Sequence, residues 1–312
     1  MTLQQLKYLL AIEEHRHFVE AARHCHVTQP TLSMMVHKLE EEIGIKIFDR
    51  SKKPITPTKD GELILEQARE VLAAARRFED IASELRGEMR GTLKLGIIPT
   101  VAPYLISRFL PHFLNTYPDI HLHITELTTD ELTTRLKRHQ LDAGILATPL
   151  DDPAIREHFL YHEEFVAYVS PDNSLLKKRY LLPDDINPER LWLLEEGHCL
   201  RTQIINLCEL RRSDSITHRL EYESGSIEAL KKMVDAGQGV TILPELAIND
   251  LSEEEHDRLR FFKPPAPVRE ISLITHRHFA RQRLLQALAE SIRKSVPDSM
   301  RKKRRKSIVL SP

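Results

Sequence analysis

A regular row of apolar residues in the first third of the chain restricts the possible folds most strongly. The row advances by alternating steps of four and three residues: Ile64, Ala68, Val71, Ala75, Phe78, Ala82 and Leu85. This heptad spacing, surrounded by charged side chains, is typical of a coiled coil. We expect residues 59–90 to form a linker helix that pairs two copies of the chain. The alternative is an amphipathic helix that packs on its own domain.

The residues before this helix, 1–58, show the pattern of three short helices and a basic loop. The third predicted helix has an inward stripe of four apolar residues: Leu32, Val36, Leu39 and Ile43. Thr28 is a good N-cap for it, and Pro30 lies in the first turn, where a missing N–H costs little. A helix, a tight turn and a second helix form the helix-turn-helix pattern, whose second helix enters the major groove of DNA. An ordinary helical subdomain with a solvated basic loop is the alternative.

Residues 91–300 alternate between short apolar runs and amphipathic stretches. The runs, which we expect to be strands, are 93–98, 120–124, 141–146, 165–169, 191–194, 240–243 and 271–274. The helices are expected near 103–116, 129–139, 200–211, 226–236 and 279–295. This alternation favours an α/β fold of parallel sheets covered by helices. Such folds bind ligands beyond the carboxyl ends of their strands, where Thr100 and Thr129 lie, although threonines there often only cap the next helix.

Two of the cysteines lie in one predicted helix. Cys199 follows Gly197 and His198 at the helix start, where neighbouring cationic groups favour a reactive thiolate, and Cys208 comes nine residues later. On a folded helix the two thiols lie on opposite faces and about 13.5 Å apart along the axis. A disulfide tolerates Cα atoms only up to about 7 Å apart, so the pair could join only if the segment refolds. The alternative is that both cysteines are small buried apolar residues.

Length and composition limit which classes of protein this chain can belong to. The 312 residues give room for two or three domains, and three cysteines are too few for a disulfide scaffold. We find neither a signal peptide nor a run of about 18 apolar residues, so we expect a cytoplasmic protein without a membrane span. The net charge is −1, but residues 301–306 read RKKRRK. We expect residues 301–312 to be a disordered basic tail, either solvated or touching DNA.

The motifs of common enzyme and metal sites do not occur. The sequence has no glycine-rich phosphate loop, no His-Glu-x-x-His pair and no nucleophile elbow, and its histidines are scattered. We therefore expect no cofactor, no metal and no enzyme activity. Two zinc sites remain as alternatives: one at His24, Cys25 and His26, and one at His198, Cys199, Cys208 and His218.

The first 58 residues resemble the winged helix-turn-helix of the LysR-type transcriptional regulators. The resemblance rests on matches in the family's order: Ala21–Ala22, Val27–Pro30, Ser33, Lys38–Glu40, Gly44, Phe48–Arg50 and Thr56–Thr58. It implies that one set of side chains faces DNA: Thr28, Gln29, Pro30, Thr31, Ser33, Met34 and His37. Arg50 and Lys53 in the wing would support this contact. The family's second part is a two-lobed, periplasmic-binding-protein-like module, with lobe I at about 91–162 and 269–300 and lobe II at about 163–268.

The second part of the chain is similar to the peroxide-sensing branch of that family. The matching residues are Gly197–Arg201, Cys208, Ile98–Leu105, Thr217–His218, Met233–Val234, Ala236–Gly237 and Ile242–Pro244. The similarity implies that Cys199 is the peroxidatic cysteine and Cys208 the resolving one. Their reversible disulfide would refold the module and re-space the DNA-binding heads. The residues implied to bind peroxide or support the site are Thr100, Thr129, His198, Arg201, His218 and Arg269.

Two features depart from that branch. Thr202 stands where its members commonly carry an aspartate, and the segment 209–224 is highly charged and longer than usual. The role assigned to that acid, and the form of the oxidised loop, are therefore left open by the resemblance.

The resemblance implies the partners of an activator of peroxide-defence genes. They are double-stranded DNA, hydrogen peroxide, further copies of the chain in a homodimer and homotetramer, RNA polymerase and a thiol reductant. Two other functions remain open. A LysR-type regulator of a small metabolite would bind it in the interlobe cleft and carry incidental cysteines. A thiol peroxidase would use the same cysteines but would have no need of a DNA-binding head.

Overall fold

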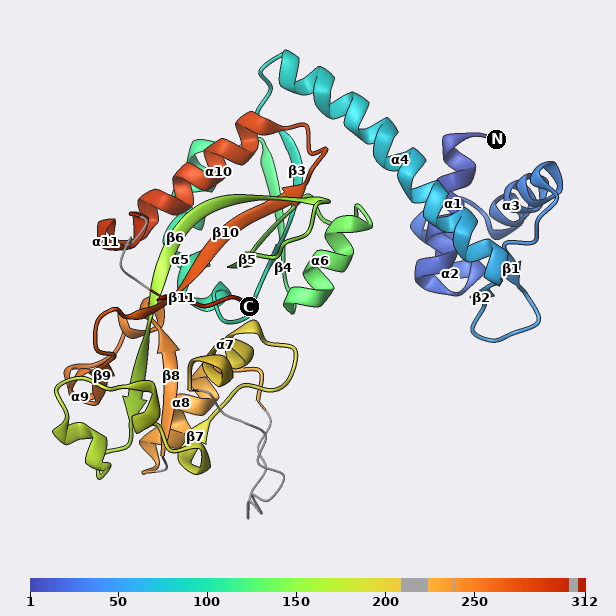
Figure 1. Ribbon diagram of the computed structural model, residues 1–312. Coiled ribbons are helices and arrows are strands. Elements are labelled where there is room, and N and C mark those ends of the chain that lie inside the picture. The colour runs from blue at the N-terminus through green and yellow to red at the C-terminus, as the bar shows by residue number, and fades with distance from the viewer. Residues whose placement is uncertain (209–223, 238, 303–307) are drawn as a thin grey trace. The chain divides into compact units, whose positions relative to one another are not determined.

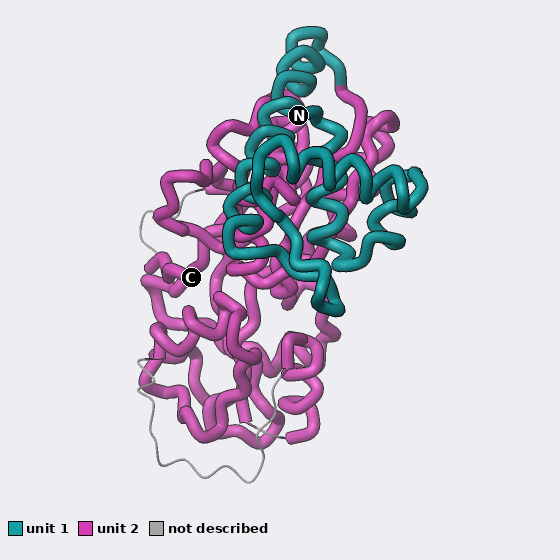
Figure 2. Tube along the Cα trace, turned by 90° about the vertical axis from the view of Figure 1, so that its right-hand side faces the viewer, with its two compact units in different colours: residues 1–88 teal, residues 89–312 magenta. Residues whose placement is uncertain are grey.

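The computed structural model describes residues 1–208, 224–237, 239–302 and 308–312. The chain divides into two compact units, Met1–Glu88 and Met89–Pro312 (Figure 2). Each unit has its own apolar core, so each is described by itself. Within the described residues, no helix is both long enough and apolar enough to cross a membrane.

The first unit is a three-helix head with a small wing, followed by a long helix (Figure 1). Its elements are α1 (Leu3–His15), α2 (Phe18–His24), α3 (Gln29–Ile43), β1 (Phe48–Asp49), β2 (Thr56–Pro57) and α4 (Lys59–Leu85). Helix α3 begins where the Thr28 hydroxyl accepts a hydrogen bond from the Thr31 amide, and it ends at Gly44 in the left-handed region, at φ 71°. The predicted winged helix-turn-helix is confirmed.

Helix α4 has two different surroundings along its length. In its first half, Leu65 and Ala68 are buried in the core of the head. From Val71 onward the larger side chains of the heptad row are exposed to solvent: Val71 is 39% exposed, Phe78 77% and Leu85 80%. Ala75 and Ala82, between them, are partly buried. The head therefore covers only the beginning of the predicted seam. The rest remains an apolar face on a single copy of the chain.

The second unit is built on one curled sheet that runs through both lobes (Figure 1). The strand order is β4-β3-β5-β10-β6-β8-β7, with β9 on β6 and β11 on β10. The strands are β3 (Gly91–Ile97), β4 (Ile120–Glu126), β5 (Ala143–Thr148), β6 (Ile155–Val169), β7 (Leu191–Trp192), β8 (Val240–Pro244), β9 (Leu259–Phe261), β10 (Pro267–His276) and β11 (Ile308–Val309). Strand β3 is parallel to β4 and β5, as predicted. Strand β10 is antiparallel to β5 and β6, because along it the chain returns from lobe II to lobe I, so the sheet is mixed.

Strand β6 joins the two lobes. Its residues 155–164 pair with β10 in lobe I, and residues 165–169 pair with β8 in lobe II. Lobe I is covered by α5 (Ala102–Thr116), α6 (Thr129–Lys137) and α10 (Gln282–Ser295). Lobe II carries α7 (Cys199–Leu207), α8 (Ile227–Asp235), α9 (Glu253–Asp257) and the 3₁₀ turns η1 (Ser174–Lys177), η2 (Pro183–Asp185), η3 (Pro188–Arg190) and η4 (Glu245–Ile248). The predicted α/β architecture is confirmed.

The C-terminal tail differs from the expectation. After the short helix α11 (Asp298–Arg301), the tail returns as β11 and pairs in parallel with the start of β10. The Ile308 amide donates to the Ala266 carbonyl at 3.2 Å, and the Leu310 amide to the Val268 carbonyl at 2.9 Å. Residues 308–310 are therefore part of the sheet, because this edge of β10 offers free backbone groups that a short apolar segment satisfies.

Candidate functional site

Helix α7 holds the two cysteines at its opposite ends. Gly197, at φ 91°, turns the chain into the helix, His198 is the N-cap and Cys199 is the first helical residue. Cys208 is the C-cap, both thiols are free, and both side chains are buried, at 7% and 8% exposure. Nine helical steps separate them by about 13.5 Å along the axis, whereas a disulfide spans about 7 Å at most. The distance conflict expected from the sequence is present.

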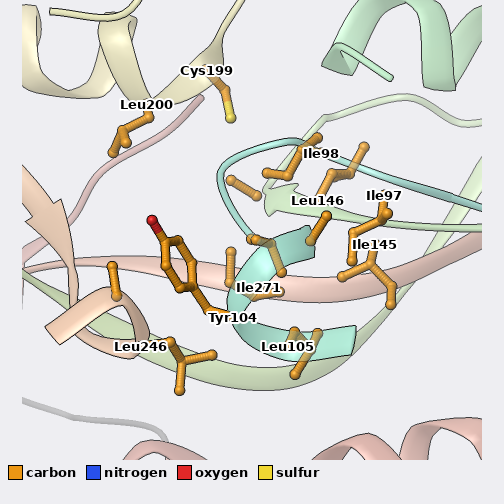
Figure 3. Close-up of a cluster of buried hydrophobic side chains, with 14 of the residues drawn as sticks. Ile97, Ile98, Tyr104, Leu105, Ile145, Leu146, Cys199, Leu200, Leu246 and Ile271 are labelled. Atoms are coloured by element: carbon orange, nitrogen blue, oxygen red, sulfur yellow. The ribbon is translucent and has the colours of Figure 1, made fainter. Parts of the chain in front are cut away.

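The start of α7 lies against the start of α6 in lobe I. A Cβ placed on Gly197 would lie 3.8 Å from the methyl group of Thr128, the residue that caps α6. Figure 3 shows Cys199 and Leu200 over the core that contains Ile98, with the Cys199 sulfur pointing into it. The hydroxyl of Thr129, the first residue of α6, is buried and has no hydrogen-bond partner among the described residues. A buried hydroxyl without a hydrogen-bond partner can bind a small polar molecule.

Thr100 is held by a buried ion pair. The Arg269 guanidinium donates to Thr100 Oγ1 at 2.9 Å and to the Thr100 carbonyl at 3.1 Å. Its Nε also donates to Glu163 Oε2 at 2.8 Å, and both charged side chains are essentially inaccessible. The pairing of Arg269 with Glu163 follows the strand register of β10 and β6. The structure thus brings Thr100 and Arg269 together, as the resemblance implied.

Glu163 was not predicted from the sequence. Its second oxygen, Oε1, accepts a hydrogen bond from the Leu246 amide at 3.1 Å. The carboxylate therefore fixes Arg269 and the start of η4 at the same time. The sequence offered little signal for it, because Glu163 lies between His162 and Glu164, ahead of the apolar run 165–169. Only its burial in the fold shows that this carboxylate requires a partner.

The other predicted support residues hold the loop before α7. His198 Nε2 lies 3.6 Å from Glu195 Oε1, and the Arg201 guanidinium donates to the Leu194 carbonyl at 2.8 Å. Thr202, in the place of the usual aspartate, is exposed. His218 and the segment 209–223 lie outside the described residues.

Cys208 sits in a place that disfavours its thiolate. Burial, with a smaller contribution from the Asp184 carboxylate, raises the pKa of Cys208 to about 11. In the folded, reduced form this thiol therefore keeps its proton at neutral pH. Because only thiolates are good nucleophiles, Cys208 must leave this environment before it can attack another sulfur.

A hydrogen bond joins the two lobes next to α7. The Tyr104 hydroxyl, on α5, donates to Glu228 Oε1, on α8, at 2.7 Å. Burial and the Glu228 carboxylate raise the pKa of Tyr104 far above its usual value, so the phenol remains a donor. Neither residue was predicted as part of a site, since only the tertiary structure brings α5 and α8 together.

The predicted DNA-reading side chains lie at the start and on the outer face of α3. Thr28, Gln29, Pro30, Thr31, Met34 and His37 are exposed, and Ser33 is partly buried. Lys53 in the wing is exposed too. Arg50 is engaged within the head, because it donates to Glu40 Oε2 at 2.7 Å and its guanidinium lies 5.1 Å from the centre of the Phe18 ring. It therefore braces the wing against α3.

One group of possible metal ligands occurs within the described residues, and it lies in the head. Ligand atoms of Glu14, His15 and His24 lie within 4.8 Å of one another. His24 belonged to one of the zinc alternatives, but Glu14 and His15 come from another helix. Cys199 and Cys208 are not part of this group.

Two family models match the chain. A model described as "Bacterial regulatory helix-turn-helix protein, lysR family" matches residues 3–62, and one described as "LysR substrate binding domain" matches residues 86–297. Among curated relatives, a hydrogen peroxide-inducible genes activator from Pectobacterium carotovorum is 35% identical over 96% of this chain and 98% of its own length. The transcriptional dual regulator OxyR of Escherichia coli is 35% identical over 94% of this chain and 95% of its own.

Solved structures agree with this assignment. A full-length OxyR from Pseudomonas aeruginosa with a cysteine-to-aspartate substitution matches with a TM-score of 0.77 and 34% identity, covering 94% of this chain and 98% of that one. A peroxide-bound cysteine-to-serine variant of OxyR from Corynebacterium glutamicum matches with a TM-score of 0.61 and 30% identity, covering 94% and 92%. The resemblance found in the sequence is confirmed, and the chain belongs to the LysR family of bacterial transcriptional regulators.

Proposed function

We propose that the chain is a hydrogen-peroxide-sensing, DNA-binding transcriptional regulator, switched by a reversible disulfide between Cys199 and Cys208. The observation that carries the proposal is the placement of two free, buried thiols at the two ends of α7. The names of the relatives support peroxide as the signal. The site offers a hydroxyl at Thr129 and a second at Thr100, fixed by Arg269, for a small molecule with two oxygens.

The first step is the oxidation of Cys199. The N-terminus of α7 presents free amide groups and the positive end of the helix dipole, both of which favour an anionic sulfur. The thiolate attacks one oxygen of peroxide, the O–O bond breaks and hydroxide leaves. Sulfur supplies the two electrons and becomes a sulfenic acid. The hydroxyls of Thr100 and Thr129 hold and orient the peroxide during this attack.

The second step joins the cysteines. Helix α7 opens, Cys208 reaches solvent and loses its proton, and its thiolate attacks the Cys199 sulfenic sulfur. The S–OH bond breaks, and the hydroxide leaves as water with the proton that Cys208 released. Leu200 and Ile204 are buried in the core of the second unit, so opening α7 removes packing from both lobes. A thiol reductant, giving two electrons, returns the switch to its first state.

The signal then reaches DNA through the association of several copies of the chain. The exposed apolar row of α4, with Val71, Phe78 and Leu85, pairs two copies as a homodimer, and two dimers form a homotetramer. Altered packing of the oxidised modules re-spaces the heads on double-stranded DNA, and RNA polymerase responds to the new arrangement. The reducing cytoplasm keeps the thiols free between signals.

The experiment is a mass measurement combined with footprinting. Peroxide-treated chain should contain a Cys199–Cys208 link, and its footprint on operator DNA should differ from that of the reduced chain. Cys199→Ser should keep the reduced footprint with and without peroxide. A missing link, or a footprint unaffected by peroxide, would overturn the proposal. Steady-state consumption of peroxide by catalytic amounts of the chain would favour a thiol peroxidase instead.

A further inference from the structure

The C-terminal strand occupies a particular stretch of β10. Strand β5 covers one edge of β10 from Glu270 onward, while β6 covers the other edge from Val268. The first two residues of β10, Pro267 and Val268, therefore lie beyond the end of β5, and β11 pairs with them there. The next residue along β10 is Arg269, which holds Thr100. The tail thus extends the sheet directly beside the candidate redox site.

The tail also contacts the helix between the two cysteines. Gln203 lies near the middle of α7 and is completely buried, at 0% exposure. Its Nε2 donates to the Leu310 carbonyl at 2.8 Å, whereas its Oε1 has no partner among the described residues. The Leu310 side chain packs on the core of the second unit. Among the described residues, the one hydrogen bond of this buried amide goes to the tail, so the amide depends on the tail for a partner.

We propose that the C-terminal strand is a catch on α7, which sets how readily the oxidised Cys199 is joined to Cys208. This inference rests on the proposed disulfide switch and adds a control to it. Attack of peroxide on Cys199 needs α7 folded, and attack of Cys208 on the sulfenic sulfur needs α7 open. The Gln203–Leu310 hydrogen bond exists only with α7 folded, so it opposes the second step and leaves the first one alone.

The size of the effect follows from the bond that is lost. A typical intramolecular hydrogen bond changes an equilibrium constant by roughly two- to tenfold. If α7 opens and closes faster than the sulfurs react, the rate of disulfide formation scales with its open fraction. Loss of the catch should therefore speed disulfide formation by that factor. Formation of the sulfenic acid should not change.

The experiment compares two shortened chains that differ only in the catch. A chain that ends at Ser307 lacks β11 and Leu310. The matched control ends at Ser311, so it keeps β11 and the Leu310 peptide carbonyl and loses only Pro312. Peroxide is added, samples are quenched with a thiol-blocking and a sulfenic-acid-trapping reagent, and mass spectrometry follows both species. A Cys208→Ser background isolates the first step.

A double-mutant cycle tests the named contact. Gln203→Leu removes the donor and is made both in the full chain and in the chain that ends at Ser307. If the tail stabilises α7 through Gln203, removing the tail should accelerate disulfide formation in the chain that keeps Gln203. In the Gln203→Leu variant the same removal should have a much smaller effect. Equal acceleration in both backgrounds would remove Gln203 from the mechanism and overturn the catch as stated.

The outcomes separate the two proposals. Faster disulfide formation in the chain that ends at Ser307, with an unchanged sulfenic acid rate and an unchanged control, supports the catch. Equal disulfide rates in both shortened chains overturn it while leaving the switch intact. If the full chain forms no sulfenic acid and no Cys199–Cys208 link, the proposed function itself fails.

Discussion

The buried ion pair of Arg269 and Glu163 gives a sharp test of how the candidate redox site is held. Arg269 donates to Glu163 Oε2 at 2.8 Å and to Thr100 Oγ1 at 2.9 Å, with no solvent access. Arg269→Met removes the cation and leaves the carboxylate buried without a counter-charge. Breaking a buried pair in this way costs about 3–5 kcal/mol. We expect the free energy of unfolding of the second unit to fall by that amount.

The single tryptophan makes this measurement specific to the second unit. Trp192 is the only tryptophan in the chain and lies in β7. Urea denaturation of the reduced chain, followed by tryptophan fluorescence, therefore reports on this unit. The matched variant is Arg269→Met combined with Glu163→Gln, which removes both charges and keeps an oxygen for the Leu246 amide. We expect it to recover most of the lost stability, because a neutral amide is easier to bury.

Reactivity should not recover together with stability. In both variants the Thr100 hydroxyl loses the guanidinium that positions it. The rate at which peroxide converts Cys199 to a sulfenic acid should therefore stay low in the double variant. A loss of less than about 1 kcal/mol in Arg269→Met, the range of an exposed pair, would contradict the argument from burial. Full recovery of the peroxide rate in the double variant would contradict the role given to Thr100.

Three further predictions concern pH, assembly and DNA. Burial and the Glu163 carboxylate raise the pKa of Glu245 from 4.5 to about 7. The folded state then binds the proton more tightly, so the free energy of unfolding should fall as the pH rises from about 4.5 to about 7, by at most about 3 kcal/mol. Urea titrations at several pH values measure this slope, and Glu245→Gln should flatten it. Phe78→Glu should raise the dimer dissociation constant at least about tenfold in sedimentation, whereas Glu79→Gln should not, because only Phe78 belongs to the apolar row. Lys53→Ala should weaken binding to all DNA sequences alike and lower the salt slope of binding by about one, as loss of a phosphate contact does.

Local patterns predicted most of the elements and the cysteine geometry. They gave only residues 165–169 of β6, however, and missed α9 and β9. The stripe of Leu32, Val36 and Leu39 identified α3, and the spacing of Cys199 and Cys208 revealed the distance conflict before any fold was known. These features depend on residues close in sequence. The heptad row was predicted as one coiled-coil seam, but its start is buried in the core of the head. The prediction missed this because periodicity shows which face of a helix is apolar and not what covers that face.

The contacts of the candidate redox site could not be predicted from local patterns. Glu163 meets Arg269 across 106 residues, and only the pairing of β6 with β10 brings them together. Arg50 was expected to support the DNA contact, which stays a prediction, but its ion pair with Glu40, ten residues away, was not visible in the local pattern. Residues 308–310 form too short an apolar run, after six cations, to indicate a strand. Edge pairing needs free backbone groups on a neighbouring strand, and these appear only in the fold.

In the proposed switch, sensing and signalling depend on different free energies, because the two thiols lie at opposite ends of α7. Sensing would require Cys199 to stay at the start of the folded α7, next to Gly197 and its contact with Thr128 of lobe I. Signalling requires α7 to open, which exposes Leu200 and Ile204 at a cost of about 1.5–3 kcal/mol for each. The free energy released by covalent oxidation can meet this cost, whereas a weakly bound metabolite could not. Substitutions on the buried face of α7 should therefore shift the speed of signalling without changing the chemistry at Cys199.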